Sequence, residues 1–419
     1  MPSLGSWLIF LTCLTAAILA VPAASHTGVE TTFSIACSSA AFAGMAMSQL
    51  LATRFRPVEH LFGGLDRVYA AHRKLGISIF ILILVHYFVT PNFKGLALTS
   101  QLNKLAGDVG EFAFYALITL MAISLVGRIP KTRLELPYHV WRFTHRFMGL
   151  AFVLVAIHLN FIKRPFDSTA LLAVYLNLCA AIGVASYLYT QLLAPMRRRA
   201  YQVAGVTAVD GATLVLATPT GRPVNAKPGQ FAFLKAQKKG LREAHPFTMA
   251  KIGEDGSVGF AIKPLGDFTR KLREDLKPGD RLSIEGGYGH FNYARGSDKQ
   301  VWLAGGIGIT PFLAMSEAML SSENKLIHLV YCVKDAGEAI GTDTLSDTAT
   351  RVPGFSWSLH ASSQGRLDAQ KLVDQLPFDA KGSELWFCGP APLRAAIQSG
   401  LKKIGIPPSK VEFERFEFR

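Results

Sequence analysis

Four histidines in two apolar segments are the residues of this sequence with the clearest chemistry. His72 and His86 lie 14 positions apart in one segment, and His145 and His158 lie 13 apart in another. Each segment is apolar enough to cross a membrane, where an ionisable residue usually has a function. Neutral imidazole is a common ligand of metals and of haem iron. Because 13–14 helical residues span about 20 Å, the spacing predicts two metal centres, one towards each face of a bilayer core about 30 Å thick.

The direction of the chain assigns the four histidines to two pairs. Both segments begin at the same side of the membrane, so His72 and His145 form an inner pair, and His86 and His158 form an outer pair. On an ideal helix, 14 residues return to within about 40° of the starting face, whereas 13 residues miss it by about 140°. The second segment is therefore expected to bend, to carry a π-bulge, or to approach its ligands differently from the first. Histidines that only hydrogen-bond within a helix bundle are the alternative.

Hydropathy and charge divide the chain into two halves. The first half is apolar, and residues 200–419 read as soluble α/β sequence. Basic residues gather in loops 54–74 and 128–146 and directly after the last span, which predicts a cytoplasmic soluble half and cytoplasmic termini. The excess of 44 Lys and Arg over 30 Asp and Glu is thus a topology signal, and no nucleic-acid partner is expected. The predicted membrane spans are 5–24, 32–53, 70–90, 108–127, 141–161 and 170–193.

The first span has a second interpretation, because Pro22-Ala23-Ala24 offers the small-residue cleavage site of a signal peptide. Its amino-terminal end lacks Lys and Arg, so a retained span is the expectation. The five cysteines form neither a C-x-x-C pair nor a C-x-x-C-H motif. This pattern argues against a cysteine-bound iron–sulfur or zinc site and against a covalently attached haem, so free thiols are expected.

The soluble half contains two kinds of pattern. Residues 200–295 alternate in period two between turn signals such as Lys227-Pro228-Gly229, which predicts a small antiparallel barrel. Residues 300–419 alternate apolar strands with helical stretches, which predicts a parallel α/β sheet. The predicted fold is a multidomain membrane protein in which a six-helix bundle is followed by an antiparallel β-barrel and an α/β parallel-sheet domain. The expected domains are 1–195, 200–297 and 298–419.

Four short runs could hold a phosphate-bearing cofactor. In the barrel region these are His245-Pro246-Phe247-Thr248 and the run from Lys263 to Thr269, in which Gly266 and Thr269 open a predicted helix. A helix N-terminus backed by a lysine suits an anion, although a plain turn and N-cap explain either run alone. In the sheet region, a strand leads into a glycine turn and a helix at Gly305, Gly306, Gly308, Thr310 and Pro311, and another strand ends at Cys388-Gly389-Pro390.

Together these runs resemble the ferredoxin-reductase-type flavoprotein module. Joined to the four-histidine segments, the chain from about residue 30 to 419 resembles the ferric reductase and NADPH oxidase superfamily, as a minimal bacterial member. The histidine separations of 14 and 13 are its most specific feature. The resemblance implies two b haems on the four histidines, FAD in the barrel, and NAD(P)H on the sheet domain. The residues that match its FAD and nucleotide motifs are those of the four runs above, Lys263 included.

The resemblance also assigns roles to single residues. Thr248 would contact the isoalloxazine, Cys388 would lie near the hydride path, and Phe416, or alternatively Phe418, would cover the flavin ring. Lys334 and Arg366 fall where the family places contacts to the 2′-phosphate, which favours NADPH over NADH, with solvated surface charge as the alternative. The turn Gly286-Gly287-Tyr288-Gly289 replaces the family's G-P-Y-G, and Thr90 stands where animal oxidases carry a further histidine.

The function implied by the resemblance is that of an enzyme in a cell membrane. It would pass electrons from cytosolic NAD(P)H through FAD and two haems to an acceptor outside, without an obligatory protein partner. Dioxygen, giving superoxide, and ferric chelate both remain open as acceptors. The alternatives are an electron-relay subunit that feeds a periplasmic protein and a haem-bearing membrane scaffold with a decayed flavin module.

Overall fold

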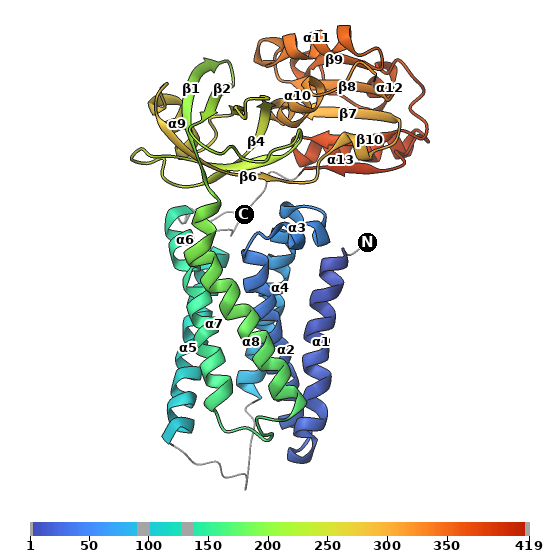
Figure 1. The fold of residues 1–419 in the computed structure, drawn as a ribbon. Helices are drawn as coiled ribbons and strands as arrows, with labels where there is room; N and C mark the ends of the chain where they lie inside the picture. Colours follow the sequence, from blue (N-terminus) through green and yellow to red (C-terminus); the bar gives the residue numbers. More distant parts are fainter. Residues whose placement is uncertain (1–2, 90–100, 127–137, 323, 415–419) are drawn as a thin grey trace. The chain divides into compact units, whose positions relative to one another are not determined.

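A computed structural model gives the fold of the chain and describes residues 3–89, 101–126, 138–322 and 324–414. The chain divides into two compact units, Met1–Pro195 and Met196–Arg419 (Figure 1). The first unit is helical, and the second contains all of the described strands. This division follows the change in hydropathy that the sequence shows after the last apolar span.

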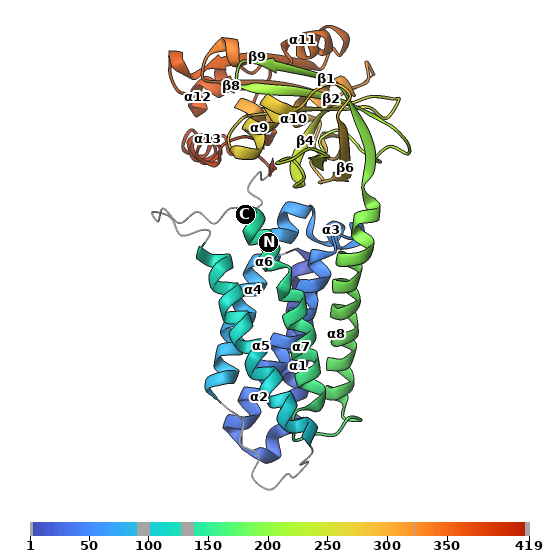
Figure 2. The same ribbon diagram turned by 90° about the vertical axis from the view of Figure 1, so that its left-hand side faces the viewer.

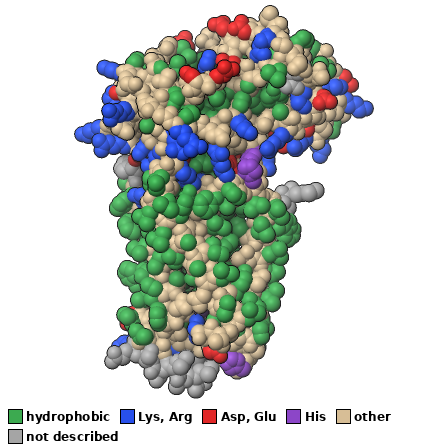
Figure 3. Space-filling model, in the orientation of Figure 1, with side chains coloured by type: hydrophobic (Ala, Val, Ile, Leu, Met, Phe, Trp, Pro, Cys, Tyr) green, Lys and Arg blue, Asp and Glu red, His purple; other side chains and the backbone are tan. Residues whose placement is uncertain are grey.

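The first unit contains six helical segments that are long and apolar enough to cross a membrane, counted among the described residues. The six predicted spans are therefore confirmed, and hydrophobic side chains cover much of the surface of this unit (Figure 3). Its helices are α1 (Leu4–Ala24), α2 (Val29–Ala52), α3 (Arg56–Phe62), α4 (Leu65–Phe88), α5 (Gln101–Val126), α6 (Tyr138–His145), α7 (Phe147–Phe161) and α8 (Leu171–Leu188), which continues into a π-helical turn (Tyr189–Leu193).

The third and fifth spans depart from the simplest sequence reading. Helix α4 begins at Leu65, five residues before the predicted start, after two glycines with positive φ at Gly63 and Gly64. The histidine at position 72 consequently lies about two turns inside the helix. The fifth span is interrupted at Arg146, directly after the first of its two histidines, so that α6 and α7 are separate helices. The 13-residue histidine spacing required such a departure from one straight helix.

The interior of the helical unit is built around α2 and α8. Phe42 of α2 stacks on Phe152 of α7 with 5.2 Å between ring centroids. A Cβ placed on Gly183 of α8 would lie 2.4 Å from the Phe152 ring, so this glycine is what allows α8 to approach. Ala16 and Ala20 of α1 are wholly buried in the same cluster. Small residues at these contacts let the helix backbones pack closely, as is usual between membrane helices.

The second unit begins with a closed antiparallel barrel in the order β1-β2-β5-β4-β3-β6, as the period-two pattern predicted. Helix α9 (Asp267–Asp275) packs Phe268 and Leu272 into the barrel core. Turns end at Gly229 and Gly279, whose φ angles of 82° and 91° favour glycine. The strands are β1 (Arg199–Val209), β2 (Ala212–Pro219), β3 (Phe231–Ala236), β4 (His245–Ile252), β5 (Val258–Ile262) and β6 (Arg281–Tyr288).

A five-stranded parallel sheet follows in the order β11-β10-β7-β8-β9, which confirms the predicted α/β domain. Figure 1 labels β10, β7, β8 and β9 in this order, and Figure 2 shows β8 and β9 from another side. One of its two cores also includes Ala212, Ala261 and Phe291 from the barrel side, so barrel and sheet share buried apolar contacts. The elements are β7 (Lys299–Gly305), α10 (Thr310–Glu317), β8 (Leu326–Val333), α11 (Thr342–Arg351), β9 (Phe355–Ala361), α12 (Ala369–Asp374), β10 (Glu384–Cys388), α13 (Ala391–Lys403) and β11 (Val411–Phe413).

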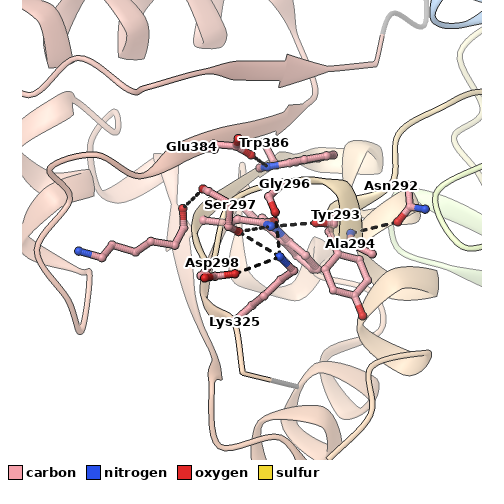
Figure 4. Close-up of polar contacts among 12 residues, drawn as sticks. Asn292, Tyr293, Ala294, Gly296, Ser297, Asp298, Lys325, Glu384 and Trp386 are labelled. Carbon is pink, nitrogen blue, oxygen red and sulfur yellow. Dashed lines mark hydrogen bonds and ion pairs between the residues drawn. The ribbon is translucent and has the colours of Figure 1, made fainter. Parts of the chain in front are cut away.

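The segment that joins barrel to sheet is held by polar side chains, one buried and one partly buried (Figure 4). The Gln300 amide donates to the carbonyls of Tyr293 (2.9 Å) and Ser297 (2.8 Å). The Lys325 ammonium, on the neighbouring strand connection, donates to the carbonyl of Gly296 at 2.8 Å. Because a buried carbonyl without a partner is costly, these bonds fix the path of the segment and with it the joint between the barrel and the sheet.

A buried histidine makes the stability of this unit depend on pH. His328 of β8 is 4 % exposed, and its two ring nitrogens contact the hydroxyls of Ser356 (2.8 Å) and Ser358 (3.1 Å). Burial lowers the pKa of His328 to about 4, against about 6.5 in an unfolded chain. The unfolded state therefore takes up the proton first, and stability is lost as pH falls from about 6.5 towards 4.

We expect His328→Gln to flatten this part of the pH dependence of the melting temperature, while His360→Gln, in the same sheet, keeps it. In the wild type, this one group changes the free energy of unfolding by at most about 1.4 kcal/mol per pH unit, and the melting temperature follows that change. Thermal unfolding of the detergent-solubilised chain, followed by tryptophan fluorescence between pH 7.5 and pH 4.5, measures the slope. An unchanged slope in His328→Gln would contradict the assignment.

Candidate functional site

The helical unit brings the two inner histidines together. The imidazole centroids of His72 on α4 and His145 on α6 are 6.1 Å apart, with 68° between ring planes. One metal with imidazoles on opposite sides, each bonded at about 2.0 Å, would separate the ring centroids by about 6 Å. The outer histidines, His86 and His158, lie close enough to interact electrostatically. The four imidazoles thus lie as two neighbouring pairs, each with one member on α4.

Polar partners determine which ring nitrogen of the α6 and α7 histidines carries the proton. His145 Nδ1 lies 3.2 Å from the Ser124 hydroxyl, and that hydroxyl donates its only hydrogen to the Leu120 carbonyl at 2.8 Å. The hydroxyl oxygen must therefore accept from His145. His158 Nδ1 lies 2.7 Å from the carbonyl of Ala106, which can only accept. Both imidazoles consequently carry the proton on Nδ1 and a lone pair on Nε2.

The α4 histidines take their partners from α2. His86 Nδ1 lies 2.9 Å from the Ser34 hydroxyl and 3.2 Å from the Ser34 carbonyl, and the hydroxyl lies 3.4 Å from the His86 carbonyl. The Ser34 carbonyl again requires Nδ1 to donate. His72 Nδ1 lies 3.1 Å from the Ser48 hydroxyl. All four histidines therefore use Nδ1 for contacts within the bundle, which orients Nε2 for a ligand.

These side chains fit haem better than a bare metal ion. Among the described residues, no group of three or more His, Cys, Asp or Glu side chains gathers as a metal site. A metal held by only two histidines must bring its remaining ligands, as haem iron does. Gly76 lies one turn beyond His72 on the histidine face of α4, and a Cβ there would meet no atom within 4 Å. This open space beside the inner pair suits a flat macrocycle.

A second glycine makes room for an outer histidine. Gly110 lies one turn after Ala106 on α5, and a Cβ placed on it would lie 2.2 Å from His158 Nδ1. The imidazole can reach the Ala106 carbonyl only because position 110 has no side chain. Gly110 is therefore a residue that positions His158, and sequence analysis alone did not single it out.

In the second unit, two glycine motifs interlock at the carboxyl edge of neighbouring parallel strands. A Cβ on Gly308 would lie 2.2 Å from the Cys388 carbonyl oxygen, and one on Gly389 would lie 2.9 Å from the Gly305 backbone. Gly306 and Gly389 also have φ angles of 54° and 152°. The predicted nucleotide loop and the Cys388-Gly389-Pro390 turn thus touch backbone to backbone, where parallel sheets usually bind ligands.

The helix after the glycine loop is held at both ends. Thr310 and Pro311 form its first turn, and the Thr310 hydroxyl donates to the Ile307 carbonyl at 3.1 Å. Arg351 donates to the carbonyls of Met319 and Glu317 at the other end. The N-terminus of α10 is therefore fixed beside the loop, where a helix dipole favours an anion.

A buried carboxylate joins the barrel motif to the sheet motif. Glu414, directly after β11, is 9 % exposed. Its Oε2 accepts from the Thr248 hydroxyl at 3.3 Å and lies 4.0 Å from Cys388 Sγ. Burial, and then the Glu414 charge, raise the pKa of the Cys388 thiol well above its ordinary value, so the thiol stays neutral. Sequence analysis missed Glu414, although an acidic residue directly after an apolar strand at the ligand edge of the sheet was a usable signal.

The rest of the first barrel motif packs against α9. The His245 ring lies 3.9 Å from the Phe268 ring, and Phe247 stacks on the same ring at 6.4 Å. Pro246 pairs with Phe233 of β3. The motif therefore lies on a strand whose neighbours are fixed on both sides, and its last residue, the threonine, points to the buried carboxylate.

The second barrel motif forms the predicted helix start, but its amides are already engaged. The Thr269 hydroxyl oxygen accepts from the amides of Leu265 and Gly266, both at 2.9 Å. Lys263 is exposed. A phosphate at this turn would have to displace the threonine hydroxyl, so of the three predicted residues only Lys263 offers a group that points to solvent.

The glycine segment that departs from the family pattern is the end of strand β6 and not a turn, and it has no room for larger residues. A Cβ on Gly286 would lie 2.6 Å from Ala232 Cβ, and one on Gly287 would lie 2.2 Å from Gln230 Oε1. The Tyr288 hydroxyl donates to the buried Glu285 carboxylate at 2.8 Å. The close fit against β3 and the tyrosine contact hold this end of β6 in place.

The two cations expected at the nucleotide's 2′-phosphate lie on adjacent loops. Lys334 follows β8 and Arg366 follows β9, and both are exposed. The Ser363 amide donates to the Lys334 carbonyl at 3.0 Å, which ties the two loops together. Lys371 reaches the Arg366 carbonyl at 3.3 Å and adds a third cation to this edge. Phe416, Phe418, Thr90 and Lys94 lie outside the described residues.

Family models match most of the chain in three consecutive stretches. Residues 37–156 match the ferric reductase like transmembrane component, residues 199–293 an FAD-binding domain, and residues 302–399 an oxidoreductase NAD-binding domain. The chain has the ferric reductase and NADPH oxidase architecture. It is a multi-pass membrane protein whose second unit contains an FAD-binding domain and a domain that matches the NAD-binding domain of oxidoreductases.

Several curated proteins resemble part of this ferric-reductase-type chain. The toluate 1,2-dioxygenase electron transfer component of Pseudomonas putida is 31 % identical over 197 residues, which cover 45 % of this chain and 58 % of that protein. A flavohemoprotein of the same species is 27 % identical, over 47 % of this chain and 53 % of that protein. The chain thus spans about half the length of the curated relatives it matches.

Two solved structures align with the chain at low sequence identity. A flavohemoglobin from Malassezia yamatoensis, with bound FAD and haem, aligns over 95 % of this chain and 98 % of its own at 17 % identity and a TM-score of 0.49. A ferredoxin reductase of carbazole 1,9a-dioxygenase aligns over 52 % of this chain and 69 % of its own at 23 % identity and a TM-score of 0.44.

We expect Gly110→Ala to lower the haem content of the purified protein, because the added methyl occupies the position of the His158 ring. Gly107→Ala is the matched control on the same helix, since its Cβ would meet only Ile162 Cδ1, at 3.9 Å. Haem per polypeptide, measured as the pyridine haemochrome, tests the expectation. A Gly110→Ala protein with the same haem content as the control would show that His158 has no ligand role.

We expect Glu414→Gln to slow reduction of the bound flavin by NADPH by roughly tenfold or more, because the charge between Thr248 and Cys388 is lost while the shape is kept. Stopped-flow absorbance of the flavin measures this rate. Glu412→Gln, two residues earlier and on the neighbouring Lys410 ion pair, is the control. Equal rates in the two variants would remove Glu414 from the site.

Proposed function

We propose that this protein passes electrons from cytoplasmic NAD(P)H, through FAD and two b haems, to an acceptor on the opposite side of a cell membrane. The observation that carries the proposal is the inner pair, in which two imidazoles of separate spans lie 6.1 Å apart. The protonated Nδ1 of His145 leaves its Nε2 lone pair for iron. The outer pair, His86 and His158, supplies the second site. The assigned domains remain 1–195, 200–297 and 298–419.

Each cofactor supplies its own chemistry when bound: FAD accepts a hydride and releases electrons singly, and haem iron carries one electron. The residues of the chain bind and orient these groups. Thr248 and the strand that holds it would contact the flavin, and the neutral Cys388 thiol would lie beside the reacting end of the nucleotide. Gly305, Gly306 and Gly308 let the backbone approach the dinucleotide.

NADPH is the preferred donor in this proposal. Lys334 and Arg366 are exposed cations on two loops that a backbone hydrogen bond ties together. A guanidinium and an ammonium at one edge would bind the 2′-phosphate that NADPH has and NADH lacks. The flavoprotein half lies in the cytoplasm, because the basic residues Arg54, Arg56 and Arg67 precede or begin the third span on the side that the positive-inside rule assigns to the cytoplasm.

His86 and His158 would together hold the iron of the outer site, so the acceptor would take its electron without binding to that iron. Dioxygen is the first candidate and yields superoxide. Ferric chelate is the second, and it is favoured by the cations Lys104, Lys163 and Arg164 on that side, which attract an anionic chelate. An electron-relay subunit that feeds a periplasmic protein is the remaining alternative.

Purified full-length protein with FAD, given NADPH under argon, tests the proposal. Haem absorbance should report reduction, and addition of air or of a ferric chelate should then identify the acceptor by the faster reoxidation. Reoxidation by neither would favour the relay alternative. The absence of haem reduction would contradict the proposal.

The His158→Ala variant places the outer site in this route. We expect it to keep flavin reduction by NADPH and to lose reduction of the outside acceptor, because one of the two outer ligands is gone. Flavin absorbance and acceptor reduction are recorded in the same sample. Acceptor reduction at the wild-type rate would mean that the electrons take another path.

A further inference from the structure

Two serines of α2 repeat the spacing of the two histidines of α4. Ser34 and Ser48 are 14 residues apart, as are His72 and His86. Because the two helices run antiparallel and in contact, Ser34 reaches His86 at 2.9 Å and Ser48 reaches His72 at 3.1 Å. The equal spacing of the serines and the histidines therefore gives two matching contacts between α2 and α4. It places a hydroxyl at the rear nitrogen of both α4 histidines.

The two histidine pairs differ in the kind of group that lies at the Nδ1 of each ring. Both inner imidazoles, His72 and His145, contact a serine hydroxyl, from Ser48 and Ser124. Both outer imidazoles contact a main-chain carbonyl, at 3.2 Å for His86 and 2.7 Å for His158. No side-chain substitution removes a main-chain carbonyl. Only the inner pair thus depends wholly on side chains for its rear hydrogen bonds.

Such a rear hydrogen bond acts on the metal through the ring. An imidazole whose Nδ1–H is given to an acceptor becomes a more basic ligand at Nε2. A more basic ligand stabilises the oxidised iron more than the reduced iron, and so lowers the reduction potential. The contacts of the described residues therefore bear on the potential of each site, in addition to holding the rings in place.

We propose that Ser48 and Ser124 are positioning residues that hold the reduction potential of the inner haem below the value it would have with unsupported imidazoles. The proposal rests on the proposed function, in that the four histidines must hold haem. In this proposal, side-chain hydroxyls influence the reduction potential of the inner haem, and main-chain carbonyls influence that of the outer haem. The inner potential is then the one that single substitutions change.

The test is a potentiometric titration of the haem absorbance of the purified, full-length holoprotein, which should resolve two waves. Ser48→Ala and Ser124→Ala should each shift the same wave to a more positive potential, and the double variant should shift it further. Ser48→Thr and Ser124→Thr, which restore the hydroxyl, should stay near the wild type. Ser38→Ala is the matched control on α2, because the Ser38 hydroxyl donates to the Ile35 carbonyl and does not reach a histidine.

Each outcome bears on a separate claim. Wild-type protein without haem would overturn the proposed function and, with it, this inference. Haem present with both waves unmoved, or moved to more negative potential, would overturn the inference and leave the haem sites standing. Ser48→Ala and Ser124→Ala acting on different waves would also overturn it, because the two serines must report on one haem.

If an alanine variant loses a haem, a second substitution at the same position still tests the proposal. Ser48→Cys and Ser124→Cys keep a side chain of similar size but offer sulfur, a weaker acceptor. If haem is retained, the potential of the same wave should become more positive. The shift should be smaller than the one expected when the hydroxyl is removed without a replacement acceptor. A cysteine variant with the wild-type potential would overturn the proposal.

Discussion

An imidazole inside a bilayer needs a partner for its N–H, and this requirement organises the helical unit. The Nδ1 of each of the four histidines lies within hydrogen-bond distance of a group on a neighbouring helix, α2 for the two on α4 and α5 for the two on α6 and α7. The same contacts pair the helices, orient the rings and leave Nε2 for a metal. Glycines at 76 and 110 keep the space that the rings and a bound group need.

The flavoprotein unit depends on an equally local constraint, the close approach of two backbones. Gly308 and Gly389 allow the nucleotide loop and the Cys388 turn to touch. The Glu414 carboxylate then connects that edge of the sheet to Thr248 in the barrel. Buried bonds from Gln300 hold the joint between the two. The barrel part and the sheet part of the site keep their relative positions because the joint between them and the carboxylate are both fixed.

Much of this architecture was predictable, because its signals are local. The length of the apolar spans, the histidine spacing and the period-two strands each predict an element from neighbouring residues alone. The partners of these elements were not predictable. In the sequence, Ser34 and Ser48 are only small residues in an apolar helix. Their contacts with the histidines become visible only when α4 is placed beside α2. The break at Arg146 has no proline or glycine to mark it, and Glu414 becomes part of a site only when β11 joins the sheet.

The central claim is that four histidines hold two haems, each between two imidazoles. The most direct measurement is the ratio of haem to FAD in the purified full-length protein, together with the electron paramagnetic resonance spectrum of its oxidised form. We predict two haems for each FAD, both with the low-spin signals expected of iron that is held by two imidazoles. Fewer than two haems, or a high-spin iron at either site, would contradict it.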